Sequence, residues 1–170
     1  MLLGSYTELR KRHMRGFIKA DEGFMLRAIE LAEEAGKNGE IPVGAVVVRN
    51  GEIIGEGRNR RESQNLVSGH AELEALDAAA KRLGDWRLSG CEMYVTLEPC
   101  PMCAAAVFQS RISALIYGAA DIYGGAAGGK INMFAYDFVQ NPPSVLPFFK
   151  KDECEELLKE FFLKKRRNLK

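Results

Sequence analysis

The sequence predicts an α/β protein. A strand, a short helix and a second strand follow one another within residues 92–117, and such a crossover joins parallel strands and places helices against the sheet. In other segments apolar residues recur at the helical spacing of three and four, or form short β-branched runs. The 170 residues are enough for one domain with its own core, and 46% hydrophobic and 28% charged residues exclude disordered and repetitive classes.

The first 40 residues divide into two parts. Residues 1–20 show no sustained apolar period and are interpreted as an N-terminal extension, followed by a single domain over residues 21–170. Asp21 and Glu22 precede apolar positions that recur at three- and four-residue steps over residues 24–35. The pattern predicts an amphipathic helix, and one of the two glycines that follow it can end it.

A β-hairpin is predicted next. Residues 43–48 form a short β-branched run, and the dipeptide Asn50-Gly51 is typical of a type I′ turn. Residues 52–57 continue as the second strand. Residues 58–69 are polar and irregular, and we interpret them as a loop.

The crossover unit follows a second long helix. Apolar spacing predicts a helix over residues 71–83, which Gly84 ends. Strand 92–97 comes next and stops before a proline, the alanine-rich stretch 103–108 reads as a helix, and residues 112–117 form another strand.

The last 50 residues contain a glycine-rich segment and a helix. The segment GAADIYGGAAGGKINMF is predicted to be a surface loop near a site. Residues 150–170 form an amphipathic helix with a basic end, KKRRNLK. The net charge is +4 over residues 1–19, −6 over 20–149 and +3 over 150–170. Basic ends on an acidic body either contact phosphate or only aid solubility.

The chain contains no apolar run long enough for a membrane-spanning helix and no signal-peptide pattern, so we expect a cytoplasmic protein. Its four cysteines are too few for a disulfide scaffold. Cys100 and Cys103 have the spacing of metal or redox chemistry.

Two short motifs suggest a metal site. His70-Ala71-Glu72 and Pro99-Cys100-Pro101-Met102-Cys103 each lie where a predicted helix begins. Two cysteines at a helix start can bind one ion, because the helix N-terminus favours the thiolate that Zn²⁺ requires. A neutral imidazole supplies a third ligand, and three protein ligands leave one tetrahedral position for a reactive water.

Glu72 has the right spacing for a proton shuttle. It lies two residues after His70 in the first turn of the same helix, so its carboxylate can stand beside the water without ligating the metal. A redox pair would not require this second motif. Structural zinc would require a fourth ligand, and Cys91, Cys154 and His13 are poorly placed for that role.

The joint motif resembles the cytidine deaminase-like superfamily of zinc-dependent deaminases. Flanking segments resemble its bacterial tRNA adenosine deaminase family: IPVGAVVV, GEGRNR, MYVTLEPCPMC, SRI and, near the end, DECEELLKEFF. The resemblance implies a three-layer α/β/α sandwich with a mixed five-stranded sheet, a homodimer and one Zn²⁺ per subunit. It also implies that a zinc-activated water attacks C6 of a flipped-out adenosine in a tRNA anticodon stem-loop.

The resemblance also implies roles for individual residues. His70, Cys100 and Cys103 are the expected metal ligands, and Glu72 is the expected catalytic residue. The substrate contacts it implies are the Asn59 side chain on the target nucleotide, Val43 on the base, the Ala71 backbone N–H near the reacting water, and Asp121 on the anticodon loop. Without the resemblance, ordinary turn residues are the simpler interpretation of Asn59 and Asp121.

The sequence departs from the family at its substrate-facing parts. Leu66-Val67-Ser68-Gly69 replaces Asp-Pro-Thr-Ala before the histidine, Ile122-Tyr123-Gly124 replaces a Lys-Thr-Gly-like stretch, and the proline-containing segment 136–149 also differs. The leading hypothesis is deamination of the wobble adenosine of tRNA to inosine. The alternatives are a deaminase of a free nucleobase or nucleoside (guanine, cytosine or a modified purine) and a non-catalytic zinc-stabilised RNA-binding protein.

Overall fold

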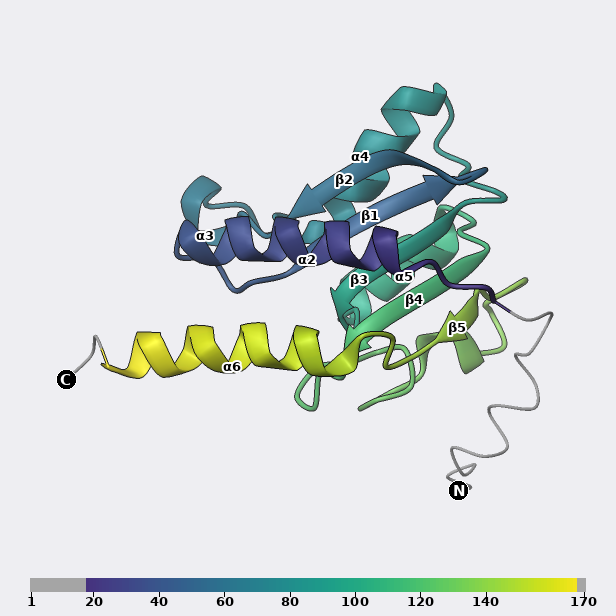
Figure 1. Cartoon of the computed structure of the whole chain (residues 1–170). Coiled ribbons are helices and arrows are strands. Elements are labelled where there is room, and N and C mark those ends of the chain that lie inside the picture. The colour runs from purple at the N-terminus through teal and green to yellow at the C-terminus, as the bar shows by residue number, and fades with distance from the viewer. Residues whose placement is uncertain (1–17, 168–170) are drawn as a thin grey trace, which may run out of the picture.

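The computed structural model describes residues 18–167, so most of the predicted extension, residues 1–17, lies outside the described residues, as does the end of the basic tail. A five-stranded mixed sheet in the order β2-β1-β3-β4-β5 forms its centre (Figure 1). β1 pairs antiparallel with β2 and β3, whereas β4 pairs parallel with β3 and β5. The strands are β1 (Gly44–Arg49), β2 (Glu52–Arg58), β3 (Glu92–Leu97), β4 (Ala114–Ala119) and β5 (Ser144–Leu146).

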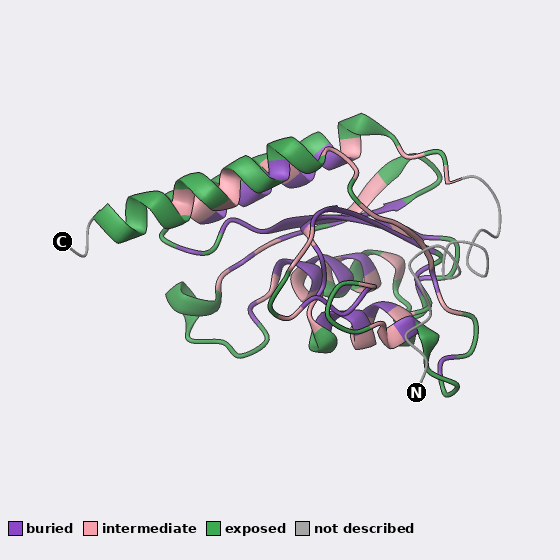
Figure 2. Ribbon diagram, turned by 90° about the horizontal axis from the view of Figure 1, so that it is seen from below, coloured by how far each residue is buried: buried purple, intermediate pink, exposed green. Residues whose placement is uncertain are grey.

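Helices cover both faces of this sheet (Figure 2). One buried cluster joins one face to α4 and α5, and a second joins the other face to α2 and α6. The three-layer α/β/α prediction is therefore confirmed. The helices are α2 (Glu22–Lys37), α3 (Arg61–Gln64), α4 (Ala71–Leu83), α5 (Pro101–Gln109) and α6 (Lys151–Arg167), with the 3-10 helix η1 (Met133–Ala135).

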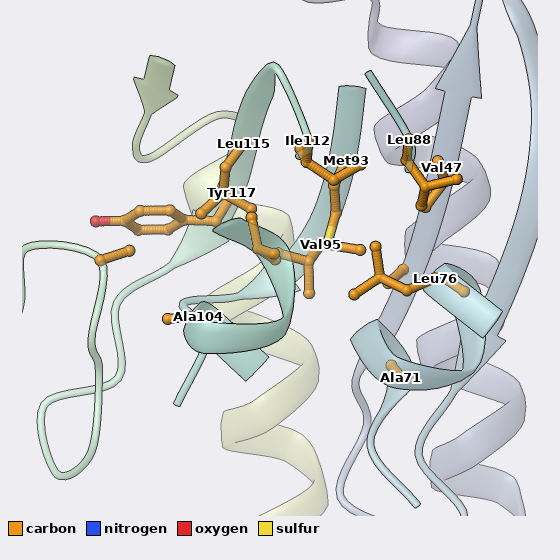
Figure 3. Close-up of a cluster of buried hydrophobic side chains, with 14 of the residues drawn as sticks. Val47, Ala71, Leu76, Leu88, Met93, Val95, Ala104, Ile112, Leu115 and Tyr117 are labelled. Carbon is orange, nitrogen blue, oxygen red and sulfur yellow. The ribbon is translucent and has the colours of Figure 1, made fainter. Parts of the chain in front are cut away.

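Alternation along the central strands assigns side chains to the two layers. In β3, Met93 and Val95 belong to the first cluster, whereas Tyr94 between them belongs to the second. Figure 3 shows the first cluster, with Ala71 on the first turn of α4 and Ala104 on α5. Because both alanines are fully buried, the starts of these two helices are fixed against the same core.

The structure adds three elements to the sequence prediction and shifts the start of a predicted strand. α3 lies within the predicted loop 58–69, η1 lies at the end of the glycine-rich segment, and β5 lies in the proline-containing segment. β4 begins at Ala114, two residues later than predicted. Arg111 has φ of 64°, and the Ile112 N–H donates to Val107 O, so these residues form the turn that ends α5.

The predicted hairpin has the geometry of its turn dipeptide. Asn50 and Gly51 have φ of 52° and 78°, the positive values that a type I′ turn requires at both central residues. β1 and β2 pair with one register shift between Val47 and Val48. No helix within residues 18–167 is long and apolar enough to cross a membrane.

Gly57 allows α4 to lie close against β2. A Cβ at this position would lie 2.1 Å from Ala71 O and 2.6 Å from Ala75 N, both backbone atoms that cannot move independently of the helix. The start of α4 is therefore positioned by the absence of a side chain on the neighbouring strand.

Gly57→Ala is expected to lower the free energy of unfolding by at least about 1–3 kcal/mol, since it overpacks this contact. Denaturant unfolding of the purified variant measures the loss. Gly36→Ala is the matched control, because its Cβ would meet only Pro42 Cβ at 3.4 Å and alanine favours the helix. Equal stabilities of the two variants would contradict the proposed close contact.

Candidate active site

Two helix starts bring the predicted metal ligands together. His70 and Cys100 are the N-cap residues of α4 and α5, both with extended backbone, and Cys103 lies on the first turn of α5. Each helix is fixed by the buried alanine that directly follows a ligand, Ala71 after His70 and Ala104 after Cys103. The three side chains therefore converge from rigid elements rather than from free loops.

The geometry fits a tetrahedral metal ion. His70 Nδ1 lies 3.8 Å from Cys100 Sγ and 3.5 Å from Cys103 Sγ, and the three ligand atoms all lie within 4.8 Å of one another. Bond lengths of about 2.0 Å to nitrogen and about 2.3 Å to sulfur at a tetrahedral angle place these atoms about 3.6 Å apart. His70 and Cys100 are half-buried and Cys103 is buried, so the group is accessible from one side.

The two thiols influence each other's protonation. A hydrogen bond with Cys103 and, to a smaller extent, one with His70 lower the pKa of the Cys100 thiol to about 4. The same hydrogen bond, together with burial, raises the pKa of the Cys103 thiol. A divalent cation bound between the two sulfurs would favour the thiolate form of both.

Glu72 is buried next to this group. Its side chain lies in the first turn of α4 and is only 4% exposed. Burial raises the pKa of the Glu72 carboxyl, and the Cys103 thiol is within hydrogen-bond reach of it. A carboxyl group that is close to the ligands, outside the three-ligand group and easily protonated is suited to proton transfer.

Two predicted substrate residues, Val43 and Asn59, are hydrogen-bonded to each other close to the segment that precedes His70. The Asn59 N–H donates to Val43 O at 3.0 Å, which joins the end of β2 to the residue before β1. The next residue, Arg60, donates its N–H to Gly69 O, directly before His70. Val43 is 8% exposed and Asn59 is 9% exposed. Val43 and Asn59 are therefore held in the segments that lead to the first ligand.

Asp121 forms a turn. Its Oδ1 accepts the N–H groups of Tyr123 at 2.9 Å and Gly124 at 3.1 Å, as an Asx-turn residue does. The carboxylate thus fixes the local loop.

Glu98 is a site residue that the sequence analysis missed. Its buried carboxylate accepts N–H groups from Asp121 at 3.2 Å, Ala127 at 3.0 Å and Gly129 at 2.7 Å. A Cβ at Gly129 would lie 2.4 Å from this carboxylate, which explains a glycine there. Glu98 therefore ties the glycine-rich loop to the strand end that carries Cys100. A signal was present, because an acidic residue directly after a buried strand requires donors from another segment.

Glu40 binds the segment around α3, which precedes His70, and the sequence analysis missed it as well. It is 1% exposed and accepts the N–H groups of Glu62 at 3.1 Å and Ser63 at 2.7 Å. Burial alone would raise the pKa of Glu40, but these hydrogen bonds lower it below its ordinary value. The segment around α3 is thereby fixed, while Val67 in the following loop is 79% exposed.

The chain matches the family model of the cytidine and deoxycytidylate deaminase zinc-binding region over residues 18–119. It is 43% identical to a tRNA-specific adenosine deaminase of Bacillus subtilis (strain 168), covering 88% of this chain and 93% of the relative. A tRNA-specific adenosine deaminase of Agrobacterium fabrum is 41% identical, with 84% and 94% covered.

Solved structures agree with these relatives. A structure from a study of A-to-I editing by tRNA:A34 deaminases at the wobble position of transfer RNA superposes with a TM-score of 0.79 at 40% identity, covering 81% of this chain and all of the other. A guanine deaminase from Bacillus subtilis gives a TM-score of 0.57 at 33% identity, with 70% and 87% covered.

Proposed function

Since the chain belongs to the cytidine and deoxycytidylate deaminase family, we propose that it hydrolyses adenosine to inosine at the wobble position of tRNA. The observation that carries the chemistry is the three-ligand group of His70, Cys100 and Cys103 beside the buried Glu72. The substrate is supported by relatives named tRNA-specific adenosine deaminase that are 41–43% identical over most of the chain.

His70 Nδ1 and the sulfurs of Cys100 and Cys103 would hold the zinc ion. When bound, the ion supplies Lewis-acid activation of water. Glu72 takes the proton that the water loses and gives it to the ring nitrogen of the target base. It then takes the second proton, from the new hydroxyl group on C6, and gives it to the departing amine, so that adenosine and water yield inosine and ammonia. The high pKa of its buried carboxyl suits both steps.

The residues next to the ligands are proposed to bind the target nucleotide. Val43 packs on the base, and the Asn59 side chain hydrogen-bonds the nucleotide. Among the residues that the structure describes, the Asn59 side-chain amide contacts only Ile41 O, at a long 3.4 Å, so it is available to a substrate. The Ala71 N–H is in the first helical residue of α4, where backbone donors have no partner within the helix, and we place it near the reacting water. Asp121 is proposed to place its turn against the anticodon loop.

Formation of inosine in an arginine anticodon stem-loop tests the proposal directly. The zinc-loaded protein is incubated at low salt with a stem-loop that carries a wobble adenosine, and the nucleosides are separated by mass spectrometry. We expect adenosine to decrease as inosine appears. A folded, zinc-loaded protein that leaves this adenosine unchanged would overturn the tRNA substrate.

Deamination of a free nucleobase is the second candidate, and the similarity to a guanine deaminase structure supports it. The larger TM-score and identity of the tRNA:A34 deaminase structure favour RNA. Salt separates the two candidates, because binding to RNA phosphates weakens steeply as salt rises. An activity on guanine that exceeds the activity on the stem-loop and changes little with salt would favour the second candidate.

The basic end of α6 is proposed to contact RNA phosphates. Lys164, Lys165, Arg166 and Arg167 occupy its last turn, and all four are exposed. Removal of residues 164–170 is expected to weaken stem-loop binding and to reduce the slope of log K against log salt by about 0.7 for each lost phosphate contact. Fluorescence anisotropy at several salt concentrations measures both. Equal losses of activity on RNA and on a free nucleoside would contradict this role.

One Zn²⁺ per subunit, a homodimer and a cytoplasmic location complete the proposal. All three follow from the family resemblance, and the relatives named for tRNA support a location where tRNA is modified. Metal analysis together with native mass spectrometry tests the first two.

A further inference from the structure

The turn that follows β4 presents an aromatic ring to solvent. Tyr123 is 86% exposed and its neighbour Ile122 is 68% exposed. Within residues 18–167, the Tyr123 side chain makes no hydrogen bond or ring contact. Packing within this described part of the chain therefore gives no reason for an aromatic residue at position 123.

The backbone that carries Tyr123 is fixed. Asp121 Oδ1 accepts the Tyr123 N–H at 2.9 Å, and Asp121 O accepts the Gly125 N–H at 2.9 Å. A tyrosine on a fixed backbone loses little conformational freedom on binding, because only two side-chain torsions remain to be ordered. The turn is thus a prearranged support for a flat ligand.

The same turn is joined to the metal-ligand segment. The Asp121 N–H donates to Glu98 Oε2 at 3.2 Å, and the Ala126 N–H donates to Pro99 O at 2.8 Å. Cys100 follows directly, and consecutive Cα atoms are about 3.8 Å apart. The turn is therefore anchored at two points to the segment that directly precedes the metal ligand Cys100.

We propose that Tyr123 is a stacking subsite for an unpaired base that flanks the target adenosine in the RNA. The inference rests on the proposed function. Proteins that recognise single-stranded loops stack splayed bases on aromatic side chains, and every base offers a flat face for this contact. A free nucleoside has no flanking base, so the subsite serves a polynucleotide substrate only.

Binding of the stem-loop to a catalytically silent Glu72→Gln background measures the contribution of the ring. Stacking on an aromatic side chain is worth about 1–3 kcal/mol per base, so Tyr123→Ala should raise Kd about 5- to 150-fold. Tyr123→Phe should stay within about 2-fold, because it keeps the ring. Trp86→Ala is the matched control: its ring is 53% exposed and lies beyond the far end of α4, and no change is expected.

Base removal in the RNA identifies the stacking partner. Abasic residues are placed one at a time on each side of the target adenosine and elsewhere in the loop. At one flanking position the loss caused by Tyr123→Ala should disappear, since the contact is already absent. An unchanged Kd for Tyr123→Ala, or equal effects of this variant at every abasic position, would overturn the subsite.

Activity separates this inference from the proposed function. An unsubstituted protein that forms no inosine in the stem-loop overturns the RNA substrate and the subsite together. An unsubstituted protein that forms inosine normally, with Tyr123→Ala equal to it in KM and kcat, overturns the subsite alone. The expected result is a raised KM for the stem-loop in Tyr123→Ala and unchanged turnover of any free nucleoside that the protein accepts.

Discussion

Glu72→Gln is expected to lower kcat on the RNA substrate by about 10²- to 10⁴-fold, the range that general acid–base catalysis contributes. Glutamine keeps the size of the side chain but cannot carry the proton between water, ring nitrogen and amine. Glu72 is 4% exposed and lies outside the group of three ligand atoms, so zinc content should remain that of the unsubstituted protein. Single-turnover kinetics together with metal analysis of the same sample measure both quantities.

Asp77→Asn is the matched control for Glu72→Gln. Asp77 also lies on α4, but it is exposed, so loss of its charge should leave kcat unchanged. Turnover by Glu72→Gln close to that of this control would show that another group moves the proton. Loss of zinc from Glu72→Gln would instead assign the carboxylate to the ligand set.

The sequence predicted the elements whose formation depends on local pattern. The amphipathic period of α2 and α4 and the Asn50-Gly51 turn each specify a conformation within a few residues. α3 was missed because its four residues bury no side chain of their own; the segment is organised by the distant Glu40. β5 was missed because three residues pair with β4 across the sheet, and such pairing leaves no local signal.

In the candidate site, too, features that are local to a residue were predicted, whereas contacts between distant segments were not. His70, Cys100 and Cys103 stand out in the sequence because a metal ion requires their chemistry, and the structure brings them together. Glu98 and Glu40 bind backbone N–H groups, which every segment possesses, so no residue pattern reveals their partners. Ligand chemistry was therefore readable from the sequence, whereas the hydrogen bonds that fix the loops required the three-dimensional arrangement.

Removal of the metal is expected to abolish activity and to leave the fold intact. The core consists of two apolar clusters that pack on the two faces of the sheet, and both ligand-bearing helices are held there by buried alanines. Cys103→Ala and chelation should therefore each remove zinc while the circular dichroism spectrum and cooperative unfolding persist. The melting temperature should fall only by the amount that metal binding to the native state contributed.

Cys91→Ala is the matched control for Cys103→Ala. Cys91 is also fully buried, but it lies outside the ligand group, so this variant should lose some stability and keep its zinc and its activity. Stoichiometric zinc retained by Cys103→Ala would refute the ligand assignment. Unfolding of the chain on chelation would identify the metal as structural. That result would favour the alternative hypothesis of a non-catalytic, zinc-stabilised RNA-binding protein. A folded, inactive apoprotein that regains activity with Zn²⁺ is the outcome that an open catalytic site requires, because its ion serves the reaction rather than the core.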